Sequence, residues 1–133
     1  MLDFKRMNHI GAIRIDHVAI DITNVDRSKA FYGGVLGLQE IPRPESFDFG
    51  GAWYQIGPEV LHLVSRSTAY PPAPHHFCLW VEDISSAAKV IESAGYEIVW
   101  DTRYKIKGID RFFVRDPEGN RVEFQGPERQ QQR

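Results

Sequence analysis

The chain has 133 residues, of which 42% are hydrophobic and 26% charged, with a formal net charge of −2 at pH 7. The length suits one compact domain with a core. The net charge is small and the charged residues are interspersed, so the chain lacks the basic excess typical of nucleic-acid-binding proteins. No apolar run approaches the roughly 18 residues that a membrane span needs, and the N-terminus lacks the apolar stretch of a secretory signal. With a single cysteine, Cys78, expected to be a small apolar filler, the sequence predicts a cytoplasmic protein.

The first half of the chain predicts a strand, a helix and three short strands. Period-2 alternation and β-branched residues predict a strand over residues 15–22, and Asn24 or Asp26 is a plausible N-cap for the helix that follows. The paired glycines at 33 and 34 weaken the later turns of this helix, because glycine has a low helix propensity. Three strand-like runs come next, at residues 38–41, 52–56 and 60–64.

The second half repeats this order. An alternating strand is expected over residues 76–81, Asp83 can cap a helix with an apolar stripe, and Gly95 can end that helix. Three strand-like runs again follow the helix, at residues 96–100, 111–115 and 121–125. Turn residues separate the last two runs in each half. The offset between the two copies is roughly sixty residues, which suits an internally duplicated half-domain.

The duplication predicts an α+β fold made of two βαβββ modules. We expect these modules to form a curved mixed sheet around a cavity, with the helices on the outer face. The expected division of the chain is a loosely ordered N-terminal arm over 1–12, a first module over 13–68, a proline-rich linker over 69–74, a second module over 75–126 and a polar tail over 127–133.

Four polar residues share one property: each lies in a strand, on the face opposite the strongest apolar stripe. His17 and His76 each open the first strand of a module, while His62 and Glu123 each sit centrally in the last strand. A pseudo-twofold relation between the modules would bring both pairs towards one point. Imidazole and carboxylate ligands suit zinc, nickel, cobalt, manganese or ferrous iron, so we expect these four residues to hold a divalent metal.

The same parity rule selects residues that could contact a substrate. Trp53, Trp80 and Phe113 could face the cavity as aromatic walls, and Arg111 shares the parity of Phe113, which makes it a candidate anion contact. Together with Gln55, these residues form the predicted substrate-binding set.

The sequence resembles the vicinal oxygen chelate superfamily, which includes glyoxalase I, fosfomycin-resistance thiol transferases, extradiol dioxygenases and bleomycin-binding proteins. The resemblance covers residues 14–126, and the matching segments are His17-Val18-Ala19-Ile20, Asp26–Tyr32 with Val35–Leu38, His76–Leu79 and Asp116–Phe124. It implies paired βαβββ modules and a homodimer whose cavity is shared between subunits. It also implies the metal ligands His17, His62, His76 and Glu123, and it leaves a thiol cosubstrate open.

Three functions remain open. The first is a metal-dependent lyase or isomerase acting on a small hydroxy- or keto-carbonyl compound, with Glu123 as the base that moves a proton and His62 as a second catalytic residue. In glyoxalase I a glutamate typically stands where this chain has His62. The second is a ferrous extradiol-type dioxygenase that uses a two-histidine, one-carboxylate set. The third is a non-catalytic protein that binds an aromatic or antibiotic ligand.

Overall fold

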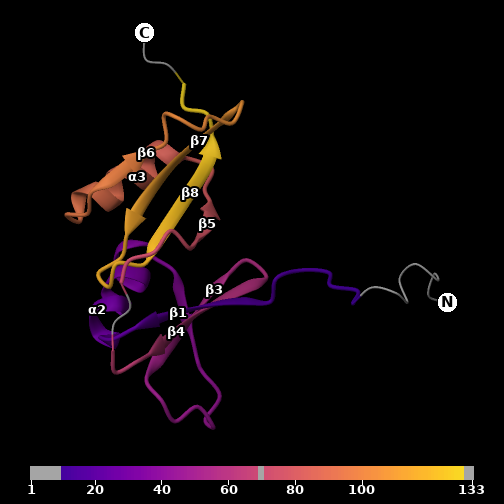
Figure 1. The fold of residues 1–133 in the computed structure, drawn as a ribbon, viewed down its shortest axis with the longest axis vertical. Helices are drawn as coiled ribbons and strands as arrows, with labels where there is room; N and C mark the ends of the chain where they lie inside the picture. The colour runs from indigo at the N-terminus through magenta and orange to yellow at the C-terminus, as the bar shows by residue number, and fades with distance from the viewer. Residues whose placement is uncertain (1–9, 69–70, 131–133) are drawn as a thin grey trace, which may run out of the picture.

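The computed structural model describes residues 10–68 and 71–130, and these form two modules that follow one another along the long axis of the molecule (Figure 1). Each module has the order strand, helix, three strands, which confirms the predicted α+β duplication. The expected arm over residues 1–12, the linker over 69–74 and the tail over 127–133 lie partly outside the described residues.

The first module is a four-stranded mixed sheet in the order β1-β4-β3-β2. Its first strand runs parallel to its last, and the other neighbours are antiparallel. The strands are β1 (His17–Ile22), β2 (Gln39–Ile41), β3 (Gly51–Ile56) and β4 (Glu59–Ser65).

The second module repeats this topology in the order β5-β8-β7-β6. Here too the first strand is parallel to the last, and the remaining pairs are antiparallel. The strands are β5 (His76–Trp80), β6 (Ile98–Trp100), β7 (Ile109–Arg115) and β8 (Arg121–Pro127). Because the topologies match, β1 and β5 are equivalent edge strands, as are β4 and β8 next to them.

The helix of the first module changes type midway. It begins as α2 (Val25–Lys29), where the side chain of Asn24 accepts a hydrogen bond from the Arg27 amide, and continues as the π-helix η1 (Ala30–Val35). The two predicted weak points, Gly33 and Gly34, lie within η1, where regular α-helical bonding is lost. A Cβ on Gly33 would lie 3.3 Å from the Tyr54 ring, so glycine also permits close packing there.

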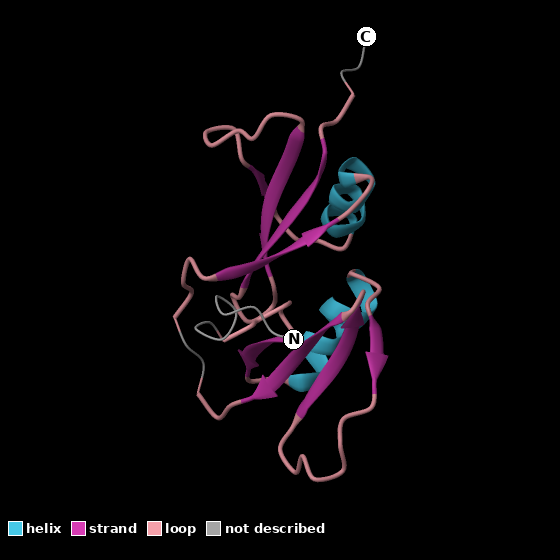
Figure 2. Cartoon of the chain, turned by 90° about the vertical axis from the view of Figure 1, so that its right-hand side faces the viewer, coloured by secondary structure: helices cyan, strands magenta, loops and turns pink. Residues whose placement is uncertain are grey.

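The helix of the second module, α3 (Ile84–Ser93), matches its prediction. Asp83 caps it by accepting from the Ser86 amide at 3.0 Å, and Gly95, at φ 94°, follows its end. Each helix packs against the apolar face of its own sheet (Figure 2). The buried residues of this core include Phe31, Tyr32, Tyr54, Leu61, Leu63, Ile84, Ile91, Phe112, Val122 and Phe124.

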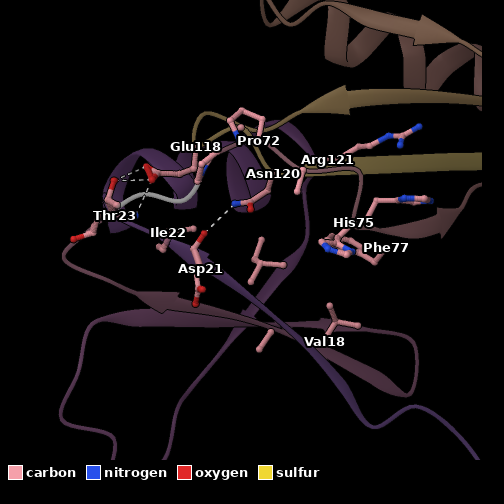
Figure 3. A pocket seen from close by; sticks show the side chains of 17 residues that line it. Val18, Asp21, Ile22, Thr23, Pro72, His75, Phe77, Glu118, Asn120 and Arg121 are labelled. Carbon is pink, nitrogen blue, oxygen red and sulfur yellow. Dashed lines mark hydrogen bonds between the residues drawn. The ribbon is translucent and has the colours of Figure 1, made fainter.

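The turn between β7 and β8 joins the two modules. The buried carboxylate of Asp116 accepts a hydrogen bond from the Tyr32 hydroxyl at 2.7 Å, which connects this turn to the first helix. Glu118 accepts from Thr23 and from Arg27, and the Asn120 side chain donates to the Asp21 carbonyl at 3.0 Å (Figure 3). These contacts fix the position of one module against the other. Within the described ranges, no helix is long and apolar enough to span a membrane.

Candidate metal centre

The two predicted ligands of the first module lie against one another. The ring of His17 on β1 stacks on that of His62 on β4, with centroids 4.2 Å apart and an interplanar angle of 11°. Trp53, the cross-strand partner of His62 on β3, covers the other face of the His62 ring at 3.9 Å and 4°. His62 is therefore held between two flat rings, which restricts its rotation.

The hydrogen bond of His17 and the surroundings of His62 favour metal binding. His17 Nδ1 lies 3.0 Å from Asp16 Oδ2, and because a carboxylate only accepts, Nδ1 is the donor; in the neutral imidazole the lone pair is then on Nε2. The same hydrogen bond lowers the pKa of Asp16. Burial, followed by the charge of His17, lowers the pKa of His62 and so favours its neutral, ligating form.

The two predicted ligands of the second module also meet. His76 Nε2 lies 2.9 Å from Glu123 Oε1, and only 3% of the glutamate residue is exposed. His76 Nδ1 lies 2.9 Å from the carbonyl oxygen of Pro74, which can only accept, so Nδ1 is the donor in this contact as well. A backbone or carboxylate acceptor on Nδ1 is the usual arrangement of a histidine whose Nε2 binds metal.

Further side chains orient the Glu123 carboxylate. Gln125 donates to Oε2 at 2.7 Å, and Arg111 lies 3.6 Å from the same oxygen while its other nitrogen pairs with Asp101 at 2.5 Å. Cys78 is the cross-strand partner of Glu123 and lies in β5, as expected, but the residue is exposed, so it does not fill the core. Burial of its thiol, and then the neighbouring Glu123, raise the pKa of Cys78 to about 12.

The two pairs occupy equivalent places in the duplicated fold. His62 is in register with Ala19, the third residue of β1, and Glu123 is in register with Cys78, the third residue of β5. His17 and His76 open those two strands. The modules thus present the same arrangement twice, as two imidazoles in one and as an imidazole with a carboxylate in the other.

Within one chain these four side chains form two pairs rather than one cluster. No group of three or more His, Cys, Asp or Glu side chains able to hold a metal is found in residues 10–68 and 71–130. A cavity of about 420 Å³ lies between the modules, bounded by β1, the linker and the β7–β8 turn (Figure 3). Of the four predicted ligands, His76 alone lines it. A single ion shared by all four residues stays a prediction that requires a second copy of the chain.

The predicted substrate-binding residues have different surroundings. Trp53 is stacked on His62, whereas 57% of Trp80 is exposed. The amide nitrogen of Gln55 is used by the β3–β4 turn, where it donates to the carbonyls of Gly57 and Glu59. The Arg111 guanidinium lies 5.7 Å from the centre of the Phe113 ring.

Sequence reasoning missed four residues that the structure places beside the pairs. Gln125 and Arg121 lie two residues either side of Glu123 on β8, so strand parity alone would have put them on the same face. Arg115 is the cross-strand partner of Arg121 and shares the parity of Phe113. Asp16 precedes β1, and nothing in the sequence pattern signals its contact with His17.

Comparison with known proteins places the chain in a family. The family model described as Glyoxalase/Bleomycin resistance protein/Dioxygenase superfamily matches residues 14–124. The chain is 30% identical over 129 residues to Glyoxylase I 4 of Arabidopsis thaliana, covering 88% of this chain and 72% of that protein.

Two solved structures are also similar. One, from Bacillus anthracis and described as a putative glyoxalase family protein, has a TM-score of 0.83 and 29% identity, covering 90% of this chain and 99% of that one. The other is a variant of the fosfomycin resistance protein FosX of Listeria monocytogenes, in complex with Mn(II) and dihydroxypropylphosphonic acid. It has a TM-score of 0.72 and 13% identity, covering 90% of this chain and 95% of that one.

Proposed function

We propose a function from one established premise, that this chain belongs to the Glyoxalase/Bleomycin resistance protein/Dioxygenase superfamily. In this proposal, the protein is a divalent-metal-dependent lyase or isomerase that acts on a small hydroxy- or keto-carbonyl compound with two neighbouring oxygen atoms. The similarity to Glyoxylase I 4 supports glyoxalase-type chemistry over other activities of this superfamily.

One observation carries the proposal: four side chains of the types that bind metals are paired at equivalent positions of two equivalent modules. His17 with His62, and His76 with Glu123, supply three imidazoles and a carboxylate, a donor set that fits zinc, nickel, cobalt, manganese or ferrous iron. The Nδ1 contacts of His17 and His76 make Nε2 the atom that would bind metal, and in His76 the metal would replace the proton between Nε2 and Glu123 Oε1. Manganese is the metal in the FosX complex.

The full donor set is proposed to assemble in a homodimer. The two pairs lie in different modules, and in the described part of one chain neither pair gains a third donor. A symmetric pair of chains can place the first module of one copy against the second module of the other, which gives two identical shared sites. This arrangement is the one that the resemblance to glyoxalase-like proteins implies.

Mixed dimers test the sharing directly. A chain carrying His17→Ala and His62→Ala is combined with a chain carrying His76→Ala and Glu123→Gln. If the sites are shared, each mixed dimer has one site with all four ligands and one with none, so it binds about half the metal of the native dimer. If each site belongs to one chain, the mixed dimer binds as little metal as either parent, and the shared cavity is refuted.

The side chains at this centre suggest how a proton would move. A bound divalent ion supplies Lewis-acid stabilisation of negative charge that develops on the substrate oxygens. Glu123 is the proposed base, since its buried carboxylate is held in one orientation by His76 and Gln125. His62, fixed between His17 and Trp53, is the proposed second catalytic residue.

Isomerisation of hemithioacetals tests the reaction class. Purified protein loaded with nickel or zinc is assayed with methylglyoxal and a panel of thiols, and turnover that is lost in Glu123→Gln is the expected result. No turnover with any thiol would count against glyoxalase-type chemistry.

The alternative is a ferrous extradiol-type dioxygenase, and a panel of catechols with measurement of oxygen uptake distinguishes it. A ligand that remains bound through purification, without metal, would favour a non-catalytic binding protein.

A further inference from the structure

We propose that Arg115 and Arg121 form an oxyanion-binding site next to the His76–Glu123 pair. The two residues are direct cross-strand partners on β7 and β8, on the face that also carries Phe113 and Glu123. Like charges directly opposite each other destabilise a sheet. An anion bound between the two guanidinium groups would offset this repulsion, which gives the two arginines a role in binding rather than in stability.

The two arginines lack anionic partners among the residues that the structure describes. In the described residues, no carboxylate lies within ion-pair distance of either guanidinium, whereas Arg111 and Arg129 are both paired with aspartates. Arg115 donates only to the backbone carbonyls of Ala73 and Gly119, and Arg121 to the carbonyl of Pro74 at 3.4 Å. A guanidinium has five N–H donors, so several remain for a ligand.

The pair borders a cavity of suitable size. An open pocket of about 460 Å³, a volume within the range of small-molecule sites, is lined by Glu97, Val99, Phe113, Val114, Arg115 and Arg121. The Arg121 guanidinium lies 3.8 Å from the centre of the Phe113 ring, and Arg121 also lines the cavity between the modules (Figure 3). Phe113 in turn meets the His76 ring edge-on at 5.7 Å, so Arg121 and His76, which are also cross-strand partners, both contact one aromatic ring.

The arginine pair is not a product of the duplication. In the first module, the position equivalent to Arg115 is Gln55, and the position equivalent to Arg121 is its cross-strand partner Val60. Only the second module carries the two charges. If the proposed function holds, a substrate would therefore be asymmetric, with its vicinal oxygens at the metal ligands and a carboxylate or phosphoryl group at the arginines.

Binding of simple anions to metal-free protein tests this site without requiring any turnover. Acetate and methylphosphonate lack vicinal oxygens, and their titration is followed by NMR at the arginine Nε–H groups and at Phe113. We expect saturable shifts at Arg115 and Arg121, and an affinity lower by about tenfold in Arg121→Gln. The anion that binds more tightly decides between a carboxylate and a phosphoryl group. Absence of saturable shifts with both anions would overturn the proposal.

Two further variants separate binding from folding. Arg103→Gln removes the same charge from an exposed loop of the second module and should leave anion affinity unchanged. Glu97→Gln removes the carboxylate that lines the cavity and should tighten binding, because the local field becomes more positive. If Arg121 serves the fold through its stacking on Phe113, Arg121→Gln will lower the melting temperature. We expect that temperature to be unchanged or raised, because the like-charge pair is relieved.

Turnover gives a second readout if the chain isomerises hemithioacetals. Methylglyoxal forms a hemithioacetal with either thiol: the one from mercaptopropionate carries a carboxylate, and the one from mercaptoethanol does not. Arg121→Gln should raise KM for the first and leave KM for the second unchanged. Equal effects on both would contradict an oxyanion site. Turnover without any anion binding would refute this inference alone and leave the proposed function intact.

Discussion

The imidazole rings of His17 and His62 lie nearly parallel at a centroid distance of 4.2 Å, although 45 positions separate them in the sequence. The parallel pairing of β1 with β4 creates this contact, because it places His62 opposite Ala19, two residues beyond His17. Trp53 completes the stack on the far side of His62. This arrangement orients a candidate ligand before any metal binds.

Replacing Trp53 should therefore weaken metal binding. Trp53→Leu removes the ring that fixes His62, and loss of such a supporting contact typically costs about 10-fold or more in metal affinity. Competition with a chromophoric chelator measures the change. Trp80→Leu, which removes an exposed tryptophan from the other module, is the matched control and should retain the native affinity. Equal affinities for the two variants would show that the stack does not support the metal ligand.

The contact between the modules should depend on the Tyr32 hydroxyl. This group donates to the buried Asp116 carboxylate, so Tyr32→Phe removes one of the two side-chain donors to Oδ2 and should cost about 1–2 kcal/mol of unfolding free energy. The Tyr54 hydroxyl is also buried but has no hydrogen-bond partner in the described part of the chain, so Tyr54→Phe should be neutral or stabilising. Urea denaturation of both variants tests this contrast, and equal losses would contradict it.

Cys78 should react slowly with alkylating reagents despite its exposure. Burial of the thiol and the neighbouring Glu123 raise its pKa to about 12, so the reactive thiolate is scarce at neutral pH. Glu123→Gln removes the repelling charge and should increase the rate of alkylation, because the pKa of the thiol falls. The rate of iodoacetamide modification as a function of pH measures both effects. A native rate typical of a free thiol would refute the predicted environment.

Stability should decrease at acidic pH partly because of Asp110. Backbone and side-chain hydrogen bonds from Arg129, and one from Lys105, lower the pKa of Asp110 to about 2 in the folded state, against 3.8 for an unperturbed group. Its contribution is therefore complete above pH 3.8 and is lost as the pH falls towards 2. That contribution is roughly 1–2 kcal/mol after allowance for solvent screening of its arginine and lysine partners. Asp110→Asn should reduce the loss of unfolding free energy between pH 3.8 and pH 2, measured by denaturation at several pH values in this range. An unchanged acid limb would show that Asp110 does not contribute.

Much of the fold followed from local sequence signals. Strand periodicity, the caps Asn24 and Asp83 and the stop at Gly95 are short-range features, and all appear in the structure. The switch of the first helix to π-type at residues 30–35 was signalled only as weakness at Gly33 and Gly34. A π-turn depends on packing, here against Tyr54, and no propensity scale encodes that contact.

The sequence pattern selected the four candidate ligands, but it did not predict their hydrogen-bond partners or their division into two pairs. Parity on strands grouped Glu123 with the cavity face, but the Pro74 carbonyl behind His76 depends on the path of the linker. The distribution of the four donors into two pairs also depends on how the modules are placed relative to each other. Hydrogen bonds such as that of Tyr32 to Asp116 set that placement, and residues 84 positions apart carry no local signal of their contact.

Metal content is the measurement that tests the central claim most directly. Protein purified without chelator should contain about one divalent ion per chain, as expected for two shared sites per dimer. Each of the variants His17→Ala, His62→Ala, His76→Ala and Glu123→Ala should lose most of that metal, and His75→Ala, which alters the neighbour of His76, should keep it. A native protein that binds no divalent ion, or a full metal content in any of the four ligand variants, would contradict the account.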